Sequence, residues 1–519
     1  MTWPRFAAIS LLCLALVANC APVASQRDPS APAGQPGTAV AVLKASAPTP
    51  TPVFATGTTV AGITVAGLTL DQAERRLRAA LSVPPEIEVR VGSLRRSLGA
   101  ELIGLTVPVE ELLTRAAPAL AGSTPVTVSA AFDYDQAALR REIAALAAEV
   151  AVPPTIHVIT STEALSRSFG FTPGRILEVD AAVARIGQGL AAGDAGPFTL
   201  TLSEDATPPR APLIQLREEV EALAAEWPGV VGFQLIDLQT GASVGFHEHT
   251  VFAGASTIKT AIMLNTYVNL DDIGEREQEL LAKMIGESDN LAANDLLAAA
   301  AGGRGTEYAF VGADAMSIML QEKLGLKHTY LYIPFEATDY IRLYKPKFRC
   351  GPKGPVGEKP YTEHGNCLRA EPASMARLYQ LIDQCAANEG LLLERFERLT
   401  AARCQEMLDY LAANDDQTRL VAGVPPGVRV EHKSGWIEDM QADAGIVRSP
   451  NGAYAIAIYI YRPLPPGRHF WPDELMAPVV AAFSRLAYTA YNPVRLDRRV
   501  EESGHTRLLR PPAGGAELN

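Results

Sequence analysis

Ser256 and Lys259 stand three positions apart in the stretch Phe252-Ala-Gly-Ala-Ser-Thr-Ile-Lys259. Residues three apart share one face of a helix, so a helix that begins at the serine would bring the two side chains together. A serine hydroxyl is a weak nucleophile that needs a neighbouring base. A lysine whose pKa is lowered by burial can be that base. An amphipathic helix with a capping serine has the same pattern, so this motif alone does not distinguish chemistry from structure.

Two further motifs add groups that acyl transfer needs. Ser288-Asp-Asn290 lies 32 residues after Ser256 and precedes a helical run, while Lys433-Ser-Gly435 precedes a strand-like run. A second hydroxyl can relay a proton to a leaving nitrogen, and an amide can hold the substrate or the lysine. A cation beside a hydroxyl matches a carboxylate, and a glycine leaves the strand bare beside a substrate.

With these three motifs in this order, residues 214–492 resemble the class A β-lactamases and penicillin-binding proteins. The resemblance implies an α/β (α+β sandwich) catalytic domain of the β-lactamase/transpeptidase type, which forms an acyl-enzyme on a serine without a metal or cofactor. Backbone N–H groups of Ser256 and Trp436 would stabilise the oxyanion. The implied site comprises, for catalysis, Ser256, Lys259 and Ser288 and, for substrate binding, Asn290, Lys433, Ser434, Gly435 and Trp436.

Three features depart from the family pattern. The interval between the first two motifs is short, which predicts a shortened helical subdomain. Glu336 falls near the place of the carboxylate that activates the deacylating water, but no asparagine follows it at the family's spacing, and a surface carboxylate is the alternative interpretation. Trp436 is bulky where small residues are usual. We therefore expect Ser256 to be labelled by a β-lactam and the label to persist longer than in an efficient β-lactamase.

Two hypotheses about function remain open at this point. The first is an exported serine hydrolase that acts on β-lactams or on D-alanyl peptides of the cell wall. The second is a non-catalytic or very slow wall-binding or penicillin-binding lipoprotein with a degenerate β-lactamase-like domain. The intact Ser256, Lys259, Ser288 and Lys433 favour the first hypothesis, and the uncertain Glu336 favours the second.

The first 54 residues carry export signals. Arg5, an apolar run and Asn19-Cys20 give residues 1–20 the outline of a secretory signal. The end of this segment resembles a bacterial lipobox, which implies a lipid on Cys20 and a membrane-anchored, extracytoplasmic protein; plain secretion or an uncleaved anchor are the alternatives. Residues 21–54 are rich in Ala, Pro, Ser and Thr and predict an extended spacer.

Residues 55–208 contain an internal repeat, which predicts two small α/β modules at 55–130 and 131–208. Asp71-Gln-Ala recurs as Asp135-Gln-Ala, with each aspartate placed as a helix N-cap, and Val83-Pro-Pro recurs as Val152-Pro-Pro. The modules resemble tandem wall-associated modules that precede exported bacterial wall enzymes, which implies peptidoglycan binding. A rigid stalk without a ligand is the alternative interpretation.

The net charge and the cysteines further limit the possible partners, cross-links and metal sites of the protein. The formal net charge of −12 excludes a nucleic-acid partner, because phosphate binding needs a basic surface. Four cysteines in an exported chain predict disulfides, and their positions favour the pairs 350–367 and 385–404. Zinc is a weak rival because no close cysteine pairs occur, and His247-Glu-His249 fits a polar turn better than a metal site. Residues 493–519 are charged and contain Gly and Pro, a composition that predicts a loose tail.

Overall fold

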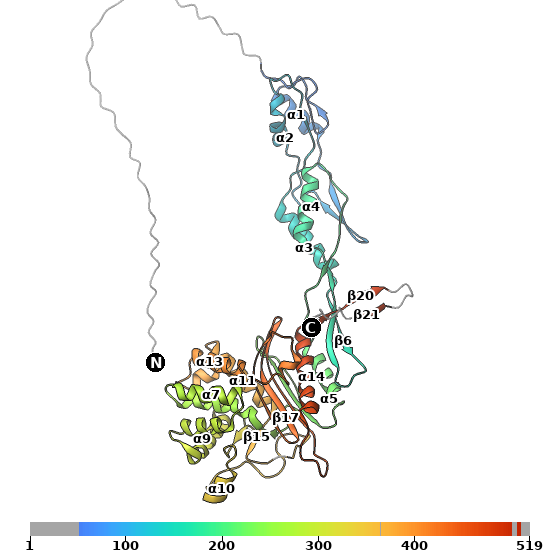
Figure 1. Ribbon diagram of the computed structural model, residues 1–519. Helices are drawn as coiled ribbons and strands as arrows, with labels where there is room; N and C mark the ends of the chain where they lie inside the picture. The colour runs from blue at the N-terminus through green and yellow to red at the C-terminus, as the bar shows by residue number, and fades with distance from the viewer. Residues whose placement is uncertain (1–50, 364, 501–505, 510–519) are drawn as a thin grey trace, which may run out of the picture.

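A computed structural model describes residues 51–363, 365–500 and 506–509. The predicted signal and the lipid site at Cys20 lie outside these residues. The molecule consists of a long arm and a larger unit at its end (Figure 1). Within the described residues, no helix is both long enough and apolar enough to cross a membrane.

The larger unit is built on one antiparallel sheet of five strands, in the order β12–β11–β18–β17–β16. The strands are β11 (Val230–Asp237), β12 (Ser243–Phe246), β16 (Arg429–Ile437), β17 (Met440–Ser449) and β18 (Gly452–Tyr461). Successive side chains of a strand point to opposite faces. In β18, Ala457 and Tyr459 therefore join the core on one face, while Ile456 and Ile458 join the core on the other.

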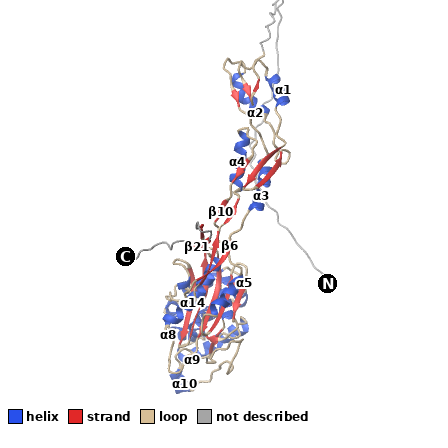
Figure 2. Cartoon of the chain, turned by 90° about the vertical axis from the view of Figure 1, so that its right-hand side faces the viewer, coloured by secondary structure: helices blue, strands red, loops and turns tan. Residues whose placement is uncertain are grey.

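Helices cover both faces of this sheet. On one face lie α5 (Leu213–Ala224) and α14 (Asp473–Tyr491), and on the other lie α6 (Lys259–Asn269) and α11 (Pro372–Ala386). A helical lobe beyond α6 contains α7 (Glu275–Gly286), α8 (Asn290–Ala300), α9 (Gly305–Ile318) and α13 (Ala401–Ala412). This α/β sandwich confirms the predicted fold class, and only α6 and α7 occupy the short interval between the first two motifs. Figure 2 shows the same layers from the side.

Both predicted disulfides are present. Cys350 is bonded to Cys367 at the base of a loop, and Cys385 of α11 is bonded to Cys404 of α13. The second bond lies inside the core of the helical lobe. Each closes a short loop, which restricts the unfolded chain by roughly 3 kcal/mol.

The arm shows the repeat as a recurring order of helix, hairpin and helix. The first copy is α1 (Leu70–Ala80), β3 (Glu86–Val91), β4 (Leu94–Gly99) and α2 (Val109–Ala116); the second is α3 (Gln136–Val150), β6 (Thr155–Thr160), β7 (Arg167–Thr172) and α4 (Val179–Ala191). Each Val-Pro-Pro sequence precedes a hairpin. Asp135 is the N-cap of α3 as predicted, but Thr69 caps α1 through a capping box with Gln72, so the prediction for Asp71 is wrong.

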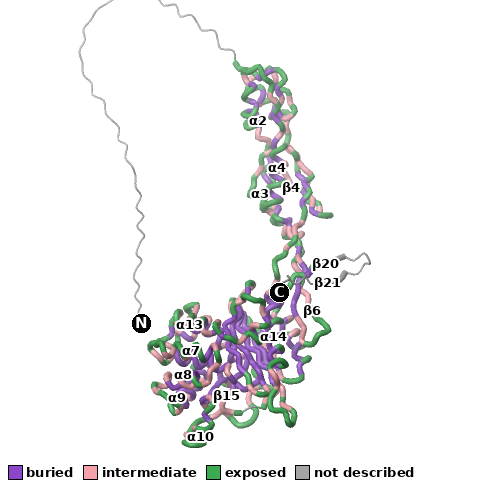
Figure 3. The backbone as a smooth tube through the Cα atoms, viewed as in Figure 1, coloured by how far each residue is buried: buried purple, intermediate pink, exposed green. Residues whose placement is uncertain are grey.

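The two copies are interlocked rather than consecutive. The core of the outer unit draws its residues from 54–81 and 107–131, whereas residues 83–105 cross into the middle unit and pack with α3 and α4. The predicted boundary between the two modules, at 130/131, therefore does not match the division of the chain between the two hydrophobic cores. The reason is that the hairpin between α1 and α2 buries its apolar face in the next unit instead of its own (Figure 3).

The second hairpin, β6–β7, repeats this step and packs on the larger unit. Phe169 is fully buried in the core that includes α14, and its backbone N–H donates to Thr489 Oγ1 over 3.0 Å. Arg167 forms ion pairs with Glu219 at 2.7 Å and Glu226 at 3.1 Å. Both contacts tie the arm to the larger unit.

Strand β19 (Val494–Arg495) completes this junction by pairing in parallel with β7, and Leu496 is buried beside it. The prediction of a loose tail is therefore wrong for residues 494–496, since the edge of β7 supplies backbone partners. The remaining elements are β1 (Thr59–Val60), β2 (Ile63–Thr64), β5 (Thr127–Val128), β8 (Gly174–Ile176), β9 (Phe198–Leu200), β10 (Ser203–Asp205), β13 (Phe252–Ala253), β14 (Tyr330–Leu331), α10 (Thr338–Tyr344), β15 (Leu368–Ala370), α12 (Leu391–Arg395), β20 (Asp497–Val500) and β21 (Thr506–Leu509).

The substitution Phe169→Ala tests the junction. It removes a buried ring from the shared core, so we expect a loss of about 3–5 kcal/mol of stability and a lower melting temperature for the larger unit. Thr162→Ala, at the exposed end of the same hairpin, is the control and should melt like the wild type. Equal melting curves for Phe169→Ala and the wild type would show that the hairpin does not stabilise the larger unit.

Candidate active site

Ser256 stands where an edge strand meets the central helix. Strand β13 pairs with β15 and leads into a 3₁₀ turn, Ala255–Ile258, from which α6 continues. Thr257 Oγ1 donates to the Gly254 carbonyl over 2.6 Å and lies 2.7 Å from the Tyr459 hydroxyl of β18. These contacts fix the turn on the sheet, so the position of Ser256 is set by the core rather than by a mobile loop.

Lys259 connects the first two motifs. Its side chain is fully buried, and Nζ lies 3.0 Å from Ser256 Oγ, 3.2 Å from Ser288 Oγ and 2.7 Å from Asn290 Oδ1. Nζ also donates to the Ser288 carbonyl over 2.6 Å. The structure thus brings together the four residues that the first two motifs predicted, and both hydroxyls lie within proton-transfer distance of one amine.

Burial, and after it the positive charge of Lys433, lower the pKa of Lys259 from 10.5 to about 7, against the opposing charges of Asp289 and Glu336. An amine with a pKa near neutrality is unprotonated in a large fraction of molecules at neutral pH. Lys259 can therefore accept the proton of Ser256.

Glu336 is part of this cluster and is not an isolated surface carboxylate. Its Oε1 accepts a hydrogen bond of 2.8 Å from Asn290 Nδ2. The side-chain amide of Asn294 donates to the backbone carbonyl of the preceding residue, Phe335, over 2.8 Å and accepts the backbone N–H of Phe335 over 2.9 Å. The Phe335 ring lies 4.8 Å from Lys259 Nζ. The exposed carboxylate of Glu336 is therefore positioned by α8, although no asparagine follows it in the stretch Ala337–Tyr344.

Three residues of the site have a left-handed backbone that is rare without glycine. They are Ala255, with φ of 42°, Ser288, with φ of 60°, and Glu336, with φ of 56°. Such conformations cost about 1–3 kcal/mol each and persist only where the surrounding structure imposes them. Contacts around Lys259 thus hold the backbone next to Ser256, at Ser288 and at Glu336 in conformations that these residues would otherwise rarely adopt.

Gly435 lets β16 approach the nucleophile. A Cβ atom at this position would lie 2.7 Å from the backbone nitrogen of Ser256 and 2.8 Å from that of Thr257. Only glycine permits this approach. The next residue, Trp436, is 63% exposed, so most of its side chain lies in solvent.

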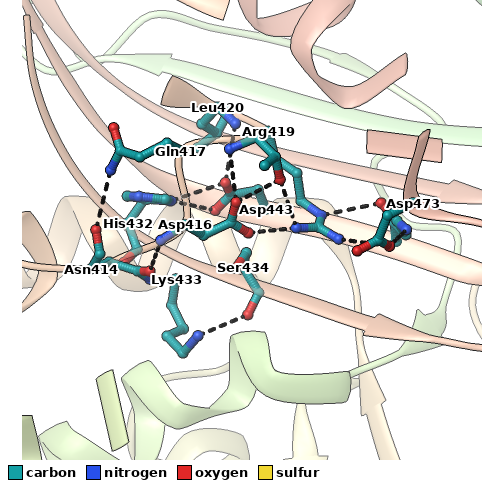
Figure 4. A network of polar contacts seen from close by, with 12 residues as sticks. Asn414, Asp416, Gln417, Arg419, Leu420, His432, Lys433, Ser434, Asp443 and Asp473 are labelled. Atoms are coloured by element: carbon teal, nitrogen blue, oxygen red, sulfur yellow. Dashed lines mark hydrogen bonds and ion pairs between the residues drawn. The ribbon is translucent and has the colours of Figure 1, made fainter. Parts of the chain in front are cut away.

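Lys433 and Ser434 belong to a larger network than the third motif predicts (Figure 4). Lys433 is 1% exposed; burial lowers its pKa to about 8, while Asp443 and Asp416 raise it. Lys433 Nζ donates to the Ser434 carbonyl, and the Ser434 hydroxyl helps to lower the pKa of the neighbouring Asp416. The groups predicted to face a substrate carboxylate therefore already have an anionic neighbour.

Arg419 compensates the negative charge of Asp416. This arginine was not identified from the sequence. It forms an ion pair of 2.5 Å with Asp416 and donates to Gln441 Oε1 over 3.1 Å and to Asp473 over 3.3 Å. Burial alone would raise the pKa of Asp416, but Arg419 and the hydroxyls around it hold that pKa below its ordinary value. A single arginine in a loop without a motif gives no signal in one sequence.

Behind Lys433, His432 Nδ1 lies 2.9 Å from Asp443, and both side chains are almost completely buried. Asp443 also accepts the backbone N–H of Leu420. Within residues 51–363, 365–500 and 506–509, no group of three or more His, Cys, Asp or Glu side chains could hold a metal ion, and the His247-Glu-His249 turn is part of no such group.

The larger unit is similar to known proteins. The profile described as "Beta-lactamase2: Beta-lactamase enzyme family" matches residues 215–274 and 276–492. No curated protein matches the chain. Among solved structures, PBP-A is 22% identical with a TM-score of 0.39 over 55% of this chain and 99% of that one. A class A β-lactamase from Mycobacterium abscessus is 17% identical with a TM-score of 0.38 over 53% and 99% of the two chains. Since the profile spans more than half of the sequence, the chain belongs to the beta-lactamase enzyme family, the penicillin-recognising serine hydrolases.

Proposed function

We propose that the protein forms an acyl-enzyme on Ser256 with β-lactams or with D-alanyl peptides of the cell wall. The observation that carries this proposal is the buried amine of Lys259, which is hydrogen-bonded to both the Ser256 and the Ser288 hydroxyl. An ordinary structural lysine would be exposed and charged. Here the amine has a lowered pKa and two candidate proton partners.

The chemistry follows from these contacts. Neutral Lys259 removes the proton of Ser256 as Oγ attacks the carbonyl carbon, and the backbone N–H groups of Ser256 and Trp436 stabilise the oxyanion. Ser288 then passes a proton from Lys259 to the leaving nitrogen. Lys433 provides a cation for the carboxylate of the substrate.

Hydrolysis of the acyl-enzyme needs a base for water, and Glu336 is the carboxylate that Asn290 holds at the site. We assign Glu336 this role. Release is slower than in an efficient β-lactamase because no asparagine follows Glu336 at the family's spacing to help to hold the water, and because Glu336 is exposed.

A slow penicillin-binding protein is the second candidate function. The observation that favours it is the buried Asp416 carboxylate beside Ser434 and Lys433, which places a negative charge near the groups that would bind a substrate carboxylate. Turnover measurements separate this candidate from the first.

The proposal includes the place where the protein works. Residues 1–20 would direct export, Cys20 would carry a lipid, and residues 21–54 would form an extended spacer between that lipid and the folded chain. The arm, residues 55–208, would bind peptidoglycan, which the repeat supports. Sedimentation of the protein with isolated peptidoglycan tests this part, and an arm that stays in the supernatant would be a spacer only.

Substitution of the first motif tests the reaction. Ser256→Ala should abolish covalent labelling by a fluorescent penicillin, because no other hydroxyl replaces the nucleophile. Lys259→Ala should slow labelling by about 10²–10⁴-fold through loss of the base. The exposed Lys323→Ala is the control and should react like the wild type. Labelling that survives Ser256→Ala would refute the assignment of the nucleophile.

The two lysines predict the pH dependence of labelling. The rate should rise with pH through about 7 as Lys259 loses its proton, and fall above about 8 as Lys433 loses its positive charge. The measurement is the second-order rate constant for acylation between pH 5 and about 10, a range that brackets both pKa values. A rate that falls through pH 7 would mean that protonated Lys259 is the active form.

Glu336→Gln separates formation of the acyl-enzyme from its hydrolysis. Labelling should proceed at the wild-type rate, and release should slow by about 10²–10⁴-fold because the glutamine cannot accept a proton. Asp339→Asn, an exposed carboxylate three residues further on, is the control. If release is unchanged in Glu336→Gln, another group activates the water.

A further inference from the structure

Helix α10 (Thr338–Tyr344) projects from the lower end of the larger unit in both views (Figures 1 and 2) and contains no buried residue. Leu343 is 67% exposed and Tyr344 is 69% exposed. A helix this short is not stable alone; it is held by Tyr340, whose ring lies 5.9 Å from that of Phe310 in α9 and 4.7 Å from that of Tyr344. Large apolar side chains are thus held out into solvent by a fixed support.

The chain beyond α10 continues this surface. Phe348 is exposed, and its ring stacks on Phe310 at 5.5 Å. The disulfide between Cys350 and Cys367 closes the loop that follows. We call residues 338–353 the basic-aromatic tip.

The charge of this tip is opposite to that of the whole chain. No Asp or Glu occurs from Tyr340 to Gly357, and four of the ten lysines of the chain lie between residues 345 and 359, although the net charge is −12. The basic residues from 340 to 357 are Arg342, Lys345, Lys347, Arg349 and Lys353. The two arginines pair with Asp339 and Asp314, whereas the three lysines form no ion pair with any residue that the structure describes.

We propose that the basic-aromatic tip binds the surface of a membrane that contains anionic phospholipids. Lysines near such a surface are attracted to the head groups, and tyrosine is enriched at the boundary between lipid and water. Leu343 and Tyr344 supply apolar area that enters this boundary, while Lys345 and Lys347 keep their charges at the head groups. A soluble polyanion would require the charges but would leave the exposed leucine and tyrosine without a partner.

The position of the tip defines the orientation that the molecule would have on the membrane. The arm leaves the larger unit at the end opposite to α10 in Figures 1 and 2, so a bound tip would point the arm away from the lipid. This proposal depends neither on the chemistry at Ser256 nor on a lipid at Cys20, because the contacts that form the tip involve neither residue.

The experiment is sedimentation of the protein with lipid vesicles. The chain is expressed without residues 1–20, so that their apolar run cannot bind lipid, and every described residue is kept. The vesicles contain equal parts of phosphatidylglycerol and phosphatidylcholine, and parallel vesicles contain phosphatidylcholine alone. We expect binding to the anionic vesicles that weakens with salt and little binding to the neutral ones.

Two double variants separate the contributions of charge and apolar area. Lys345→Gln/Lys347→Gln should bind about 10- to 30-fold more weakly, and Leu343→Ser/Tyr344→Ser should bind about tenfold more weakly. The controls are Lys323→Gln/Lys327→Gln and Ile214→Ser, which alter exposed side chains elsewhere. All variants should keep the wild-type melting temperature and Ser256 labelling rate.

Several outcomes would overturn the proposal. They are equal binding by both tip variants and the wild type, equal binding to neutral and anionic vesicles, or no binding at all. Loss of binding in the lysine variant without any change in Leu343→Ser/Tyr344→Ser would also overturn it, because that result assigns the tip to a polyanion or an acidic protein surface.

Discussion

The arrangement of the site depends on the burial of one ammonium group. An isolated charge in the protein interior is unfavourable by several kcal/mol, and Lys259 is accommodated by two means. Acceptors from Ser256, Ser288 and Asn290 surround Nζ, and its pKa falls until the neutral form is accessible. Those acceptors come from the start of α6, the turn before α8 and the first turn of α8, so the helical lobe and the sheet must pack correctly before the amine has partners. Catalytic geometry and folding of this unit are therefore the same requirement.

Much of this could be predicted from the sequence because the chemistry uses local motifs. Ser256 with Lys259, and Ser288 with Asn290, are each fixed by spacing within a single turn. The prediction of export, together with four cysteines, led to the two disulfides that the structure contains. Residues that act across the fold were not predictable. Arg419 and Asp416 meet Ser434 through the loop before β16, and Asn294 positions Phe335 across 41 residues of sequence. Their roles depend on tertiary contacts that no single-sequence pattern records.

The arm illustrates a different limit. The repeated Val-Pro-Pro correctly indicates a recurring unit, but a repeat in sequence does not reveal which copy buries which hairpin. Strands β3 and β4 leave the outer unit because their apolar faces are covered by α3 and α4, and β6 and β7 do the same against α14. Each unit is thus completed by part of its neighbour. This linkage opposes bending between units, since separation of two units would expose Phe169 or the equivalent core of the middle unit to water.

The two buried lysines explain why acidic residues surround the third motif. Both amines lose the solvation of water, and each destabilises the positive charge of the other. A base must be neutral while a carboxylate receptor must be charged, so the two pKa values have to differ in a definite order. Asp443 and Asp416 lie beside Lys433 and favour its charged form, while Lys259 has only the weaker influence of Asp289 and Glu336 and the opposing charge of Lys433. The acidic network behind β16 therefore favours the charged form of Lys433 in the pH range where Lys259 is neutral, and the ion pair with Arg419 partly compensates the negative charge of Asp416.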